Sequence, residues 1–155
     1  MLSLKELLNS NSFLLIQNPT SKKMVLDNIC NEAFLKYNID KNLLLNNLIR
    51  REKIGTTTIG NGIAIPHVQN DQIIKPSCIV TILSKGLDFD ALDNNPVDLI
   101  VLLILPELSK SENLQILAQV SRLLRDVEII HKLRGCKSEE SAFAIISQHL
   151  NNKAA

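Results

Sequence analysis

The sequence predicts one α/β domain (α+β in some classification schemes), in which helices cover both faces of a central β-sheet. Two patterns lead to this three-layer architecture. Apolar residues recur at helical spacing in the first and last thirds of the chain, whereas continuous Val, Ile and Leu runs in the middle are typical of buried strands. Because helices precede and follow these strands, both faces can be covered. The 155 residues, 45% of them apolar, suffice for one core, and we expect a single domain over 1–155 with its core in residues 3–150.

The first third of the chain predicts three helices and one strand. Residues 3–9 favour a short helix, and residues 13–16 form a compact apolar run that is typical of a strand. A turn follows, and Asp40 is placed to cap a further helix that ends near Gly55. The helix between them has one apolar face, made of Leu26, Ile29, Cys30, Ala33, Phe34 and Tyr37.

The middle of the chain predicts strands. Residues 56–62 favour extended backbone and turns, and residues 63–65 a short strand. Residues 77–83 and 97–105 are almost continuously apolar, which indicates strands buried on both faces. The polar segment 88–96 is expected to connect them.

The last third predicts helices again. Ser109 and Glu112 fit a capping box at the start of the first helix. Its expected apolar face is made of Leu114, Leu117, Ser121 and Leu124. A second helix over 128–134 ends at Gly135, and Ser138 opens the last one.

Composition excludes several functional classes. The formal charge is +1, which argues against a broad nucleic-acid surface. The longest apolar run has seven residues, from Leu99 to Leu105, and a bilayer span needs about 20, so no membrane insertion is expected. The first residues do not resemble a secretory signal. Three widely spaced cysteines are typical of reduced thiols, and we expect a cytoplasmic protein.

The candidate site is the segment Gly60–His67. His67 follows Pro66, which restricts the backbone beside the imidazole, and the two glycines allow close approach of an incoming group. Histidine forms covalent intermediates when one ring nitrogen is free and the other carries the proton, which a backbone carbonyl commonly accepts. Hydroxyl groups of the nearby threonines 56–58, with Arg50 and Arg51, suit an anion such as phosphate.

Each of these features also has a structural interpretation. A histidine after a proline is often structural, the two arginines can be a solvated helix end, and the threonines can be strand formers. The glycines do not continue into a dinucleotide-binding fingerprint, since Ile65 stands where a small residue belongs. His131 and His149 are expected at the surface, and neither has zinc-ligand spacing with His67, so no metal site is expected.

Four segments of the chain resemble the fructose/mannitol-type IIA proteins of the bacterial phosphoenolpyruvate-dependent phosphotransferase system, and the free-standing nitrogen-regulatory members most. They are residues 51–55 (REKIG), 59–67 (IGNGIAIPH), 89–99 (FDALDNNPVDL) and 133–134 (LR). Because these segments spread over most of the chain, the match is specific. The resemblance implies a mixed sheet flanked by helices.

The resemblance also implies that His67 accepts a phosphoryl group from a phosphorylated HPr-like carrier protein, with Arg51 neutralising the phosphate. The candidates for supporting the phosphate are the hydroxyl groups of Thr57 and Thr58 and the backbone amides of Gly60, Asn61 and Gly62. This transfer needs neither a metal ion nor an organic cofactor. The protein is then a phosphotransferase component that carries the group, and not an enzyme that turns over independently.

The sequence departs from the family at two positions. Many members carry a second histidine where this chain has Asn113. Asparagine donates hydrogen bonds but does not titrate, so we expect Asn113 to orient the phosphate and not to transfer protons. The family usually has a small residue where this chain has Val68, and we expect that side chain to narrow the access of a donor protein.

Three functions remain open. The first is a regulatory phosphocarrier of the nitrogen type, whose phosphorylation state changes its binding to target proteins such as potassium-transport or sensor-kinase components. The second is a IIA subunit of fructose- or mannitol-class sugar uptake, which passes the phosphate to a cysteine of a IIB protein. The third is a regulatory binding module that is not phosphorylated.

Overall fold

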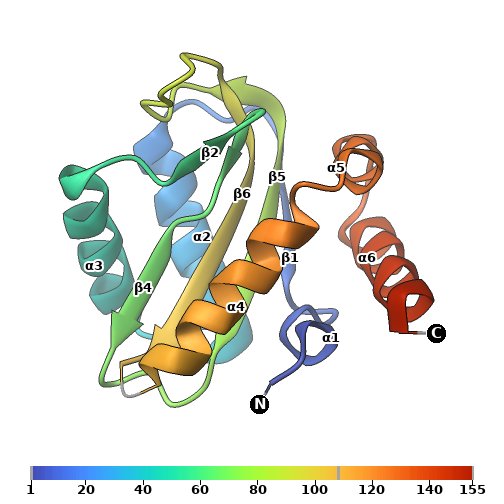
Figure 1. The fold of residues 1–155 in the computed structure, drawn as a ribbon. Coiled ribbons are helices and arrows are strands. Elements are labelled where there is room, and N and C mark those ends of the chain that lie inside the picture. The colour runs from blue at the N-terminus through green and yellow to red at the C-terminus, as the bar shows by residue number, and fades with distance from the viewer. Residues whose placement is uncertain (1, 108, 155) are drawn as a thin grey trace.

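A six-stranded mixed sheet forms the centre of the computed structural model, which describes residues 2–107 and 109–154 (Figure 1). The strand order is β1-β5-β6-β3-β2, and β4 also pairs with β6. β5 and β6 are antiparallel, as are β2 and β3, whereas the remaining pairs are parallel. The predicted mixed sheet is therefore confirmed. The strands are β1 (Phe13–Ile16), β2 (Thr58–Gly60), β3 (Ile63–Ala64), β4 (His67–Asn70), β5 (Ser77–Leu87) and β6 (Val97–Pro106).

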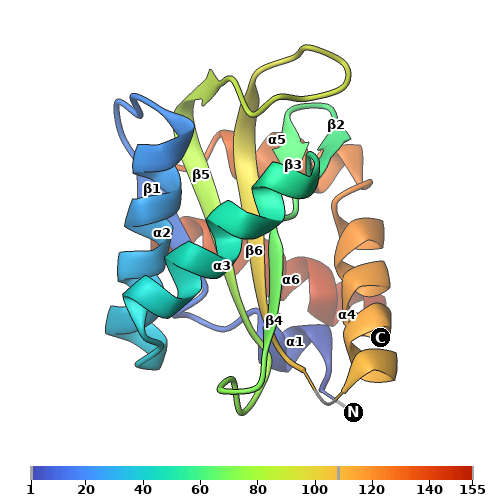
Figure 2. The ribbon, with the colours of Figure 1, turned by 90° about the vertical axis from the view of Figure 1, so that its left-hand side faces the viewer.

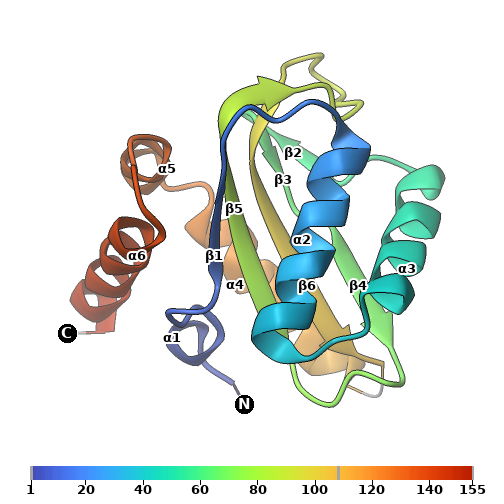
Figure 3. The ribbon, with the colours of Figure 1, turned by 180° about the vertical axis from the view of Figure 1, so that it is seen from behind.

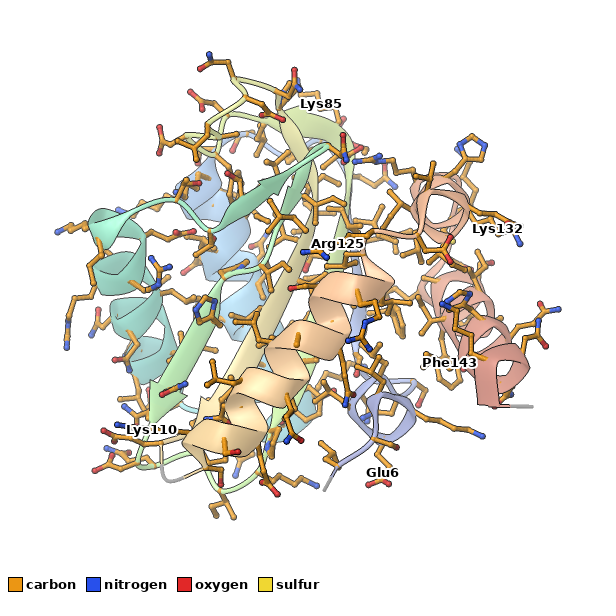
Figure 4. All side chains as sticks on the ribbon, in the orientation of Figure 1. Glu6, Lys85, Lys110, Arg125, Lys132 and Phe143 are labelled. Carbon is orange, nitrogen blue, oxygen red and sulfur yellow. The ribbon has the colours of Figure 1, made fainter. Side chains whose placement is uncertain are left out.

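Helices cover both faces of the sheet, as the sequence predicts. Figures 2 and 3 show one helical layer on each side. The first layer contains α2 (Lys22–Tyr37) and α3 (Lys41–Ile54). In the second layer, α4 runs along the sheet from Lys110 towards Arg125 (Figure 4). This second layer contains α1 (Leu4–Leu7), α4 (Lys110–Leu123), α5 (Val127–Arg134) and α6 (Glu139–Ala154).

β6 separates two hydrophobic cores, because successive side chains of a strand point to opposite faces. One core lies between the sheet and the layer of α4 to α6 and contains Leu99, Val101 and Leu103. The other lies under α2 and α3 and contains Ile100, Leu102 and Ile104. The most apolar segment is thus a central strand. No helix in residues 2–107 or 109–154 has the length and hydropathy needed to cross a bilayer.

β3 and β4 follow one another along the same side of β6. Ile63 pairs with Leu99, and His67 pairs with Leu103, four residues further along β6. Between the two short strands, the Leu103 amide donates a hydrogen bond to the Pro66 carbonyl at 3.0 Å. This arrangement places His67 at the first position of β4.

Helix starts agree with the sequence at Asp40 but not at Ser109. The Asp40 carboxylate accepts a hydrogen bond from the Leu43 amide at 3.0 Å, which caps α3. Ser109 precedes α4, but its side chain makes no capping hydrogen bond, so the predicted capping box is wrong. Its backbone has φ −111° and ψ 52°, away from the extended conformation from which a capping side chain reaches the first turn.

Two predicted apolar faces need correction. In α4, the predicted Leu114 is 68% exposed. Its buried stripe is instead Asn113, Ile116, Val120 and Leu123. Because this stripe begins with a polar residue, hydrophobic periodicity misses Asn113 and takes Leu114 in its place, although the predicted Leu124 is buried and Leu117 packs partly against the core. In α2, Phe34 is 49% exposed, since it lies at the edge of the stripe that Ala33 completes.

Candidate functional site

His67 projects towards the face of the sheet that α4 covers. The next residue, Val68, is buried in the core under α2 and α3, and neighbouring side chains of a strand point to opposite faces. The paired residue Leu103 lies in the core on the α4 side. Val68 therefore does not line the approach to the imidazole, and the expectation that it narrows access is wrong. The histidine itself is partly buried.

The carbonyl of Ile65 fixes the ring of His67. The His67 Nδ1 atom lies 2.9 Å from the Ile65 oxygen. A carbonyl oxygen only accepts hydrogen bonds, so Nδ1 carries the proton, and Nε2 is the free nitrogen of the neutral ring. Both Ile65 and Pro66 are buried, which holds this carbonyl in place. The ring is thus in the tautomer that a nucleophilic Nε2 requires.

Arg51 lies in the last turn of α3, the helix that packs beside β4. Its Nη1 atom donates to the carbonyl of Gly55, at the end of the same helix, at 3.0 Å. Arg51 is partly buried, whereas its neighbour Arg50 is exposed. The guanidinium of Arg51 is therefore held in place, and its remaining donors are available to an anion.

The predicted threonine hydroxyls have partners within the protein, and that of Thr57 acts as the donor. The Thr57 hydroxyl donates to the Glu52 carboxylate at 3.1 Å, and Thr57 is buried. The Thr58 hydroxyl lies 2.9 Å from that of Thr56. Because Thr57 already donates its one hydroxyl proton to a carboxylate, it supports the local backbone in this structure.

The turn Gly60–Asn61–Gly62 lies away from His67. All three residues have positive φ, at 92°, 55° and 76°. The turn leads into Ile63, which pairs with β6 four residues before the partner of His67. At the rise of a strand, this separation is about 13 Å. The structure therefore does not bring these three amides to the imidazole, and the turn contacts Arg134 instead.

Asn113 is buried in the first turn of α4, with 2% of its surface exposed. Its Nδ2 donates to the carbonyl of Pro106 at 2.6 Å, and its Oδ1 is buried with no partner among the described residues. Pro106 pairs with Asn70, three residues beyond His67 on β4. Asn113 thus ties α4 to the end of β6, on the sheet face towards which His67 projects.

Sequence reasoning missed Glu52. Its side chain is only 7% exposed, although it lies in the last turn of α3. A carboxylate there opposes the helix dipole, so it is an unfavourable position for a glutamate without a specific partner. That placement, beside Arg51 and Lys53, is the signal from which Glu52 could have been found.

The other histidines do not join the site. His131 is exposed on α5, as predicted, but the His149 side chain is only 13% exposed, with Nε2 3.7 Å from the Asp126 carboxylate, so the prediction of a surface position is wrong for His149. Packing between α5 and α6 buries it. Among residues 2–107 and 109–154, no group of three or more His, Cys, Asp or Glu side chains is arranged to hold a metal ion.

The chain belongs to the family described as "Phosphoenolpyruvate-dependent sugar phosphotransferase system, EIIA 2", which it matches over residues 6–149. It is a phosphotransferase-system IIA protein by fold and sequence.

Among its relatives, a nitrogen regulatory protein of Pseudomonas aeruginosa is 35% identical over 147 residues, covering 94% of this chain and 96% of the relative. A fructose-specific EIIA component of Haloferax volcanii is 32% identical, covering 70% of this chain and 71% of the relative. The crystal structure of the nitrogen regulatory protein IIA-Ntr from Neisseria meningitidis superimposes with a TM-score of 0.82 at 26% identity, covering 92% of this chain and 98% of that one.

Proposed function

We propose that this protein carries a phosphoryl group on Nε2 of His67 and that its phosphorylation state changes which partner it binds. The observation that carries the proposal is the contact between His67 Nδ1 and the Ile65 carbonyl, because it leaves Nε2 as the nucleophile. Relatives named nitrogen regulatory protein, of which the Pseudomonas aeruginosa protein matches along almost its whole length, support the regulatory role.

The reaction is a phosphoryl exchange between two imidazoles. Nε2 of His67 attacks the phosphorus of a phosphohistidine on an HPr-like carrier, a phosphorus–nitrogen bond forms, and the donor's phosphorus–nitrogen bond breaks. The electron pair of the broken bond returns to the donor ring. Nδ1 keeps its proton, and its hydrogen bond to the Ile65 carbonyl stabilises the positive charge that the ring gains. Arg51 is the candidate for neutralising the phosphoryl oxygens.

Phosphorylation adds about two negative charges beside β4. These charges favour a basic partner surface and oppose an acidic one, so the modified and unmodified forms bind different surfaces. Potassium-transport and sensor-kinase components are the candidate targets, and the test for each is binding to both forms. Asn113 is the residue that the sequence suggests for orienting the phosphoryl group, but its buried Nδ2 already donates to the Pro106 carbonyl, so we infer that it supports the site by fixing α4 against β6.

Transfer to a IIB protein is the second candidate function. One relative is named a fructose-specific EIIA component. A further solved structure, at 16% identity and a TM-score of 0.74, is titled a complex of IIA-mannitol with phosphorylated IIB-mannitol, and at this identity it supports the fold alone.

The test is phosphorylation with phosphoenolpyruvate, enzyme I and the HPr-like carrier. We expect an acid-labile, base-stable label on the wild type, none on His67→Ala, and a normal label on His131→Ala, which alters an exposed histidine. A wild type that stays unlabelled while the carrier is labelled contradicts the proposal and favours a binding module. Rapid transfer from the labelled protein to a sugar-class IIB favours the second function.

A further inference from the structure

Glu52 places a nearly buried carboxylate beside the hydroxyl of a buried threonine. Its two oxygens lie 3.1 and 3.4 Å from Thr57 Oγ1, and one lies 3.8 Å from Lys22 Nζ. Burying a carboxylate costs free energy unless such partners compensate it. Lys22 is itself 3.6 Å from Asp90, so the carboxylate is one member of a network that joins α3, α2 and the segment after β5.

From Thr57, main-chain contacts continue to the histidine. The carbonyl of Thr57 accepts a hydrogen bond from the Ile65 amide at 2.9 Å. The carbonyl of the same Ile65 accepts the Nδ1 proton of His67, also at 2.9 Å. Glu52, Thr57, Ile65 and His67 are therefore linked by three consecutive hydrogen bonds, from the end of α3 to the ring.

We propose that Glu52 is a positioning residue for His67, acting through Thr57 and Ile65; this role rests on His67 being the phosphoryl acceptor. Glu52 holds the Thr57 side chain in place. The Thr57 carbonyl, which accepts the hydrogen bond from the Ile65 amide, is thereby fixed as well. The Ile65 carbonyl then stays directed at Nδ1, and Nε2 keeps its free electron pair. Without this support, the carbonyl moves relative to the ring, and the proton distributes between both nitrogens.

The geometry also separates Glu52 from its neighbour. Arg51 and Glu52 share the last turn of α3, but Arg51 donates to Gly55 whereas Glu52 accepts from Thr57. The two charges therefore have different tasks. Arg51 is the candidate for binding the phosphate, whereas Glu52 binds the protein's own Thr57 hydroxyl.

The experiment uses four variants of the full chain. Thr57→Val removes the hydroxyl while keeping the shape of the side chain, and Thr57→Ser restores the hydroxyl. Glu52→Gln keeps an acceptor but removes the charge. Glu32→Gln is the matched control, because Glu32 lies on α2, is 17% exposed, and pairs only weakly with Lys36 at 4.0 Å.

Two measurements are made on each variant. The ¹⁵N chemical shifts of the His67 ring in the unphosphorylated protein report which nitrogen carries the proton. Single-turnover transfer from the phosphorylated carrier reports the rate. We expect Thr57→Val to shift the ring towards a mixture of tautomers and to slow transfer by about tenfold, as misplaced reactive groups do. Glu52→Gln should have a smaller effect in the same direction, whereas Thr57→Ser and Glu32→Gln should match the wild type.

Ring shifts and rates that stay at wild-type values in both Thr57→Val and Glu52→Gln overturn the proposal. Ring shifts and transfer rates in Thr57→Ser that differ from the wild type as much as those of Thr57→Val also overturn it. If Thr57→Val does not fold, which its amide spectrum reveals, Glu52→Gln and Thr57→Ser decide the matter. If the wild type takes no phosphate, the proposed function fails, while the ring shifts still decide whether Glu52 positions His67.

Discussion

Arg134 holds Asp98 through both oxygens of its carboxylate. The Nε atom of Arg134 lies 3.0 Å from each oxygen, and Nη2 lies 2.9 Å from one of them. The same Nη2 donates to the carbonyl of Asn61. One arginine at the end of α5 therefore fastens the start of β6 and the turn between β2 and β3.

Removing this arginine should destabilise the protein more than removing a surface charge. We expect Arg134→Ala to lower the free energy of unfolding in urea by about 2 kcal/mol, because charge-assisted hydrogen bonds to Asp98 and Asn61 are lost. The matched control is Lys132→Ala, which breaks an exposed pair with Glu128 at 3.2 Å. Lys132→Ala should lower the free energy of unfolding by less than about 0.5 kcal/mol. Equal losses in the two variants would contradict the fastening role.

Gly62 cannot be replaced without loss. At φ 76°, an added Cβ atom would lie 2.8 Å from Arg134 Nη2 and 3.1 Å from an oxygen of Asp98. We expect Gly62→Ala to lower the thermal midpoint and to cost more than about 1 kcal/mol, since both the backbone and the ion pair are strained. Gly55→Ala is the control, because nothing lies within 4 Å of the place that an added Cβ atom would take and its φ of 167° is extended. A Gly55 variant as unstable as the Gly62 variant would exclude this explanation.

Asn113 should tolerate a carboxylate poorly. Asn113→Asp replaces the Nδ2 donor with an oxygen that faces the Pro106 carbonyl in a buried place. We expect a loss of about 2 kcal/mol or more at pH 7, reduced at acidic pH as the carboxyl takes up a proton and donates. Asn28→Asp, at an exposed position of α2, should cost little. Urea denaturation of both variants at two pH values tests this. If Asn113→Asp leaves the free energy of unfolding unchanged at pH 7, the hydrogen bond to Pro106 contributes little.

Ionisation of the buried Cys30 thiol should lower the free energy of unfolding at alkaline pH. It is fully buried, and burial raises the pKa of its thiol from 9.0 to about 12, with a smaller contribution from Asp27. The thiol ionises more readily in the unfolded chain, so the stability it contributes is present below pH 9 and is lost between pH 9 and 12. The expected slope is about 1.4 kcal/mol per pH unit. Cys30→Ala should be less stable than the wild type at pH 8, but its free energy of unfolding should fall less between pH 8 and 11. Equal falls in the two proteins would contradict the role of Cys30 in the alkaline loss of stability.

Arg51 should contribute to transfer where Arg50 does not. We expect Arg51→Ala to slow single-turnover transfer by about 100-fold, the scale of losing a preorganised donor to a developing charge. Arg50→Ala, on the exposed side of the same helix turn, should transfer at the wild-type rate. Similar transfer rates for the wild type, Arg51→Ala and Arg50→Ala would show that Arg51 does not contribute to transfer.

Long apolar patterns predicted the core of the fold. The runs that became β5 and β6 were found within a few residues, because continuous apolar sequence has few places in a folded protein except a buried strand. The two-residue β3 and four-residue β4 carry no readable period, so their positions beside β6 could not be predicted. Their register decides that the glycine turn lies away from His67.

The candidate site was predicted only in part. The need for an acceptor at the proton-bearing nitrogen of His67 follows from imidazole chemistry, but the choice of the Ile65 carbonyl depends on local backbone geometry. The hydroxyl of Thr57 is predicted to support a phosphate because it lies near His67 in the sequence, and the sequence does not assign it to Glu52. The position of Glu52 in the last turn of α3 is a local sign that it has a partner, but its burial and the identity of that partner are tertiary effects.

The hydrogen bond between the Thr57 carbonyl and the Ile65 amide has a consequence for how the protein folds. All the bonds from Glu52 to His67 join residues of one short stretch of chain, and the entropy lost on closing such small loops is low. Contacts of this kind can form early in folding, whereas those of Arg134 with Asp98 and Asn61 need segments 36 and 73 residues away in the chain. We therefore expect the segment from Glu52 to His67 to fix the orientation of the histidine ring early in folding, before the rest of the domain packs around it.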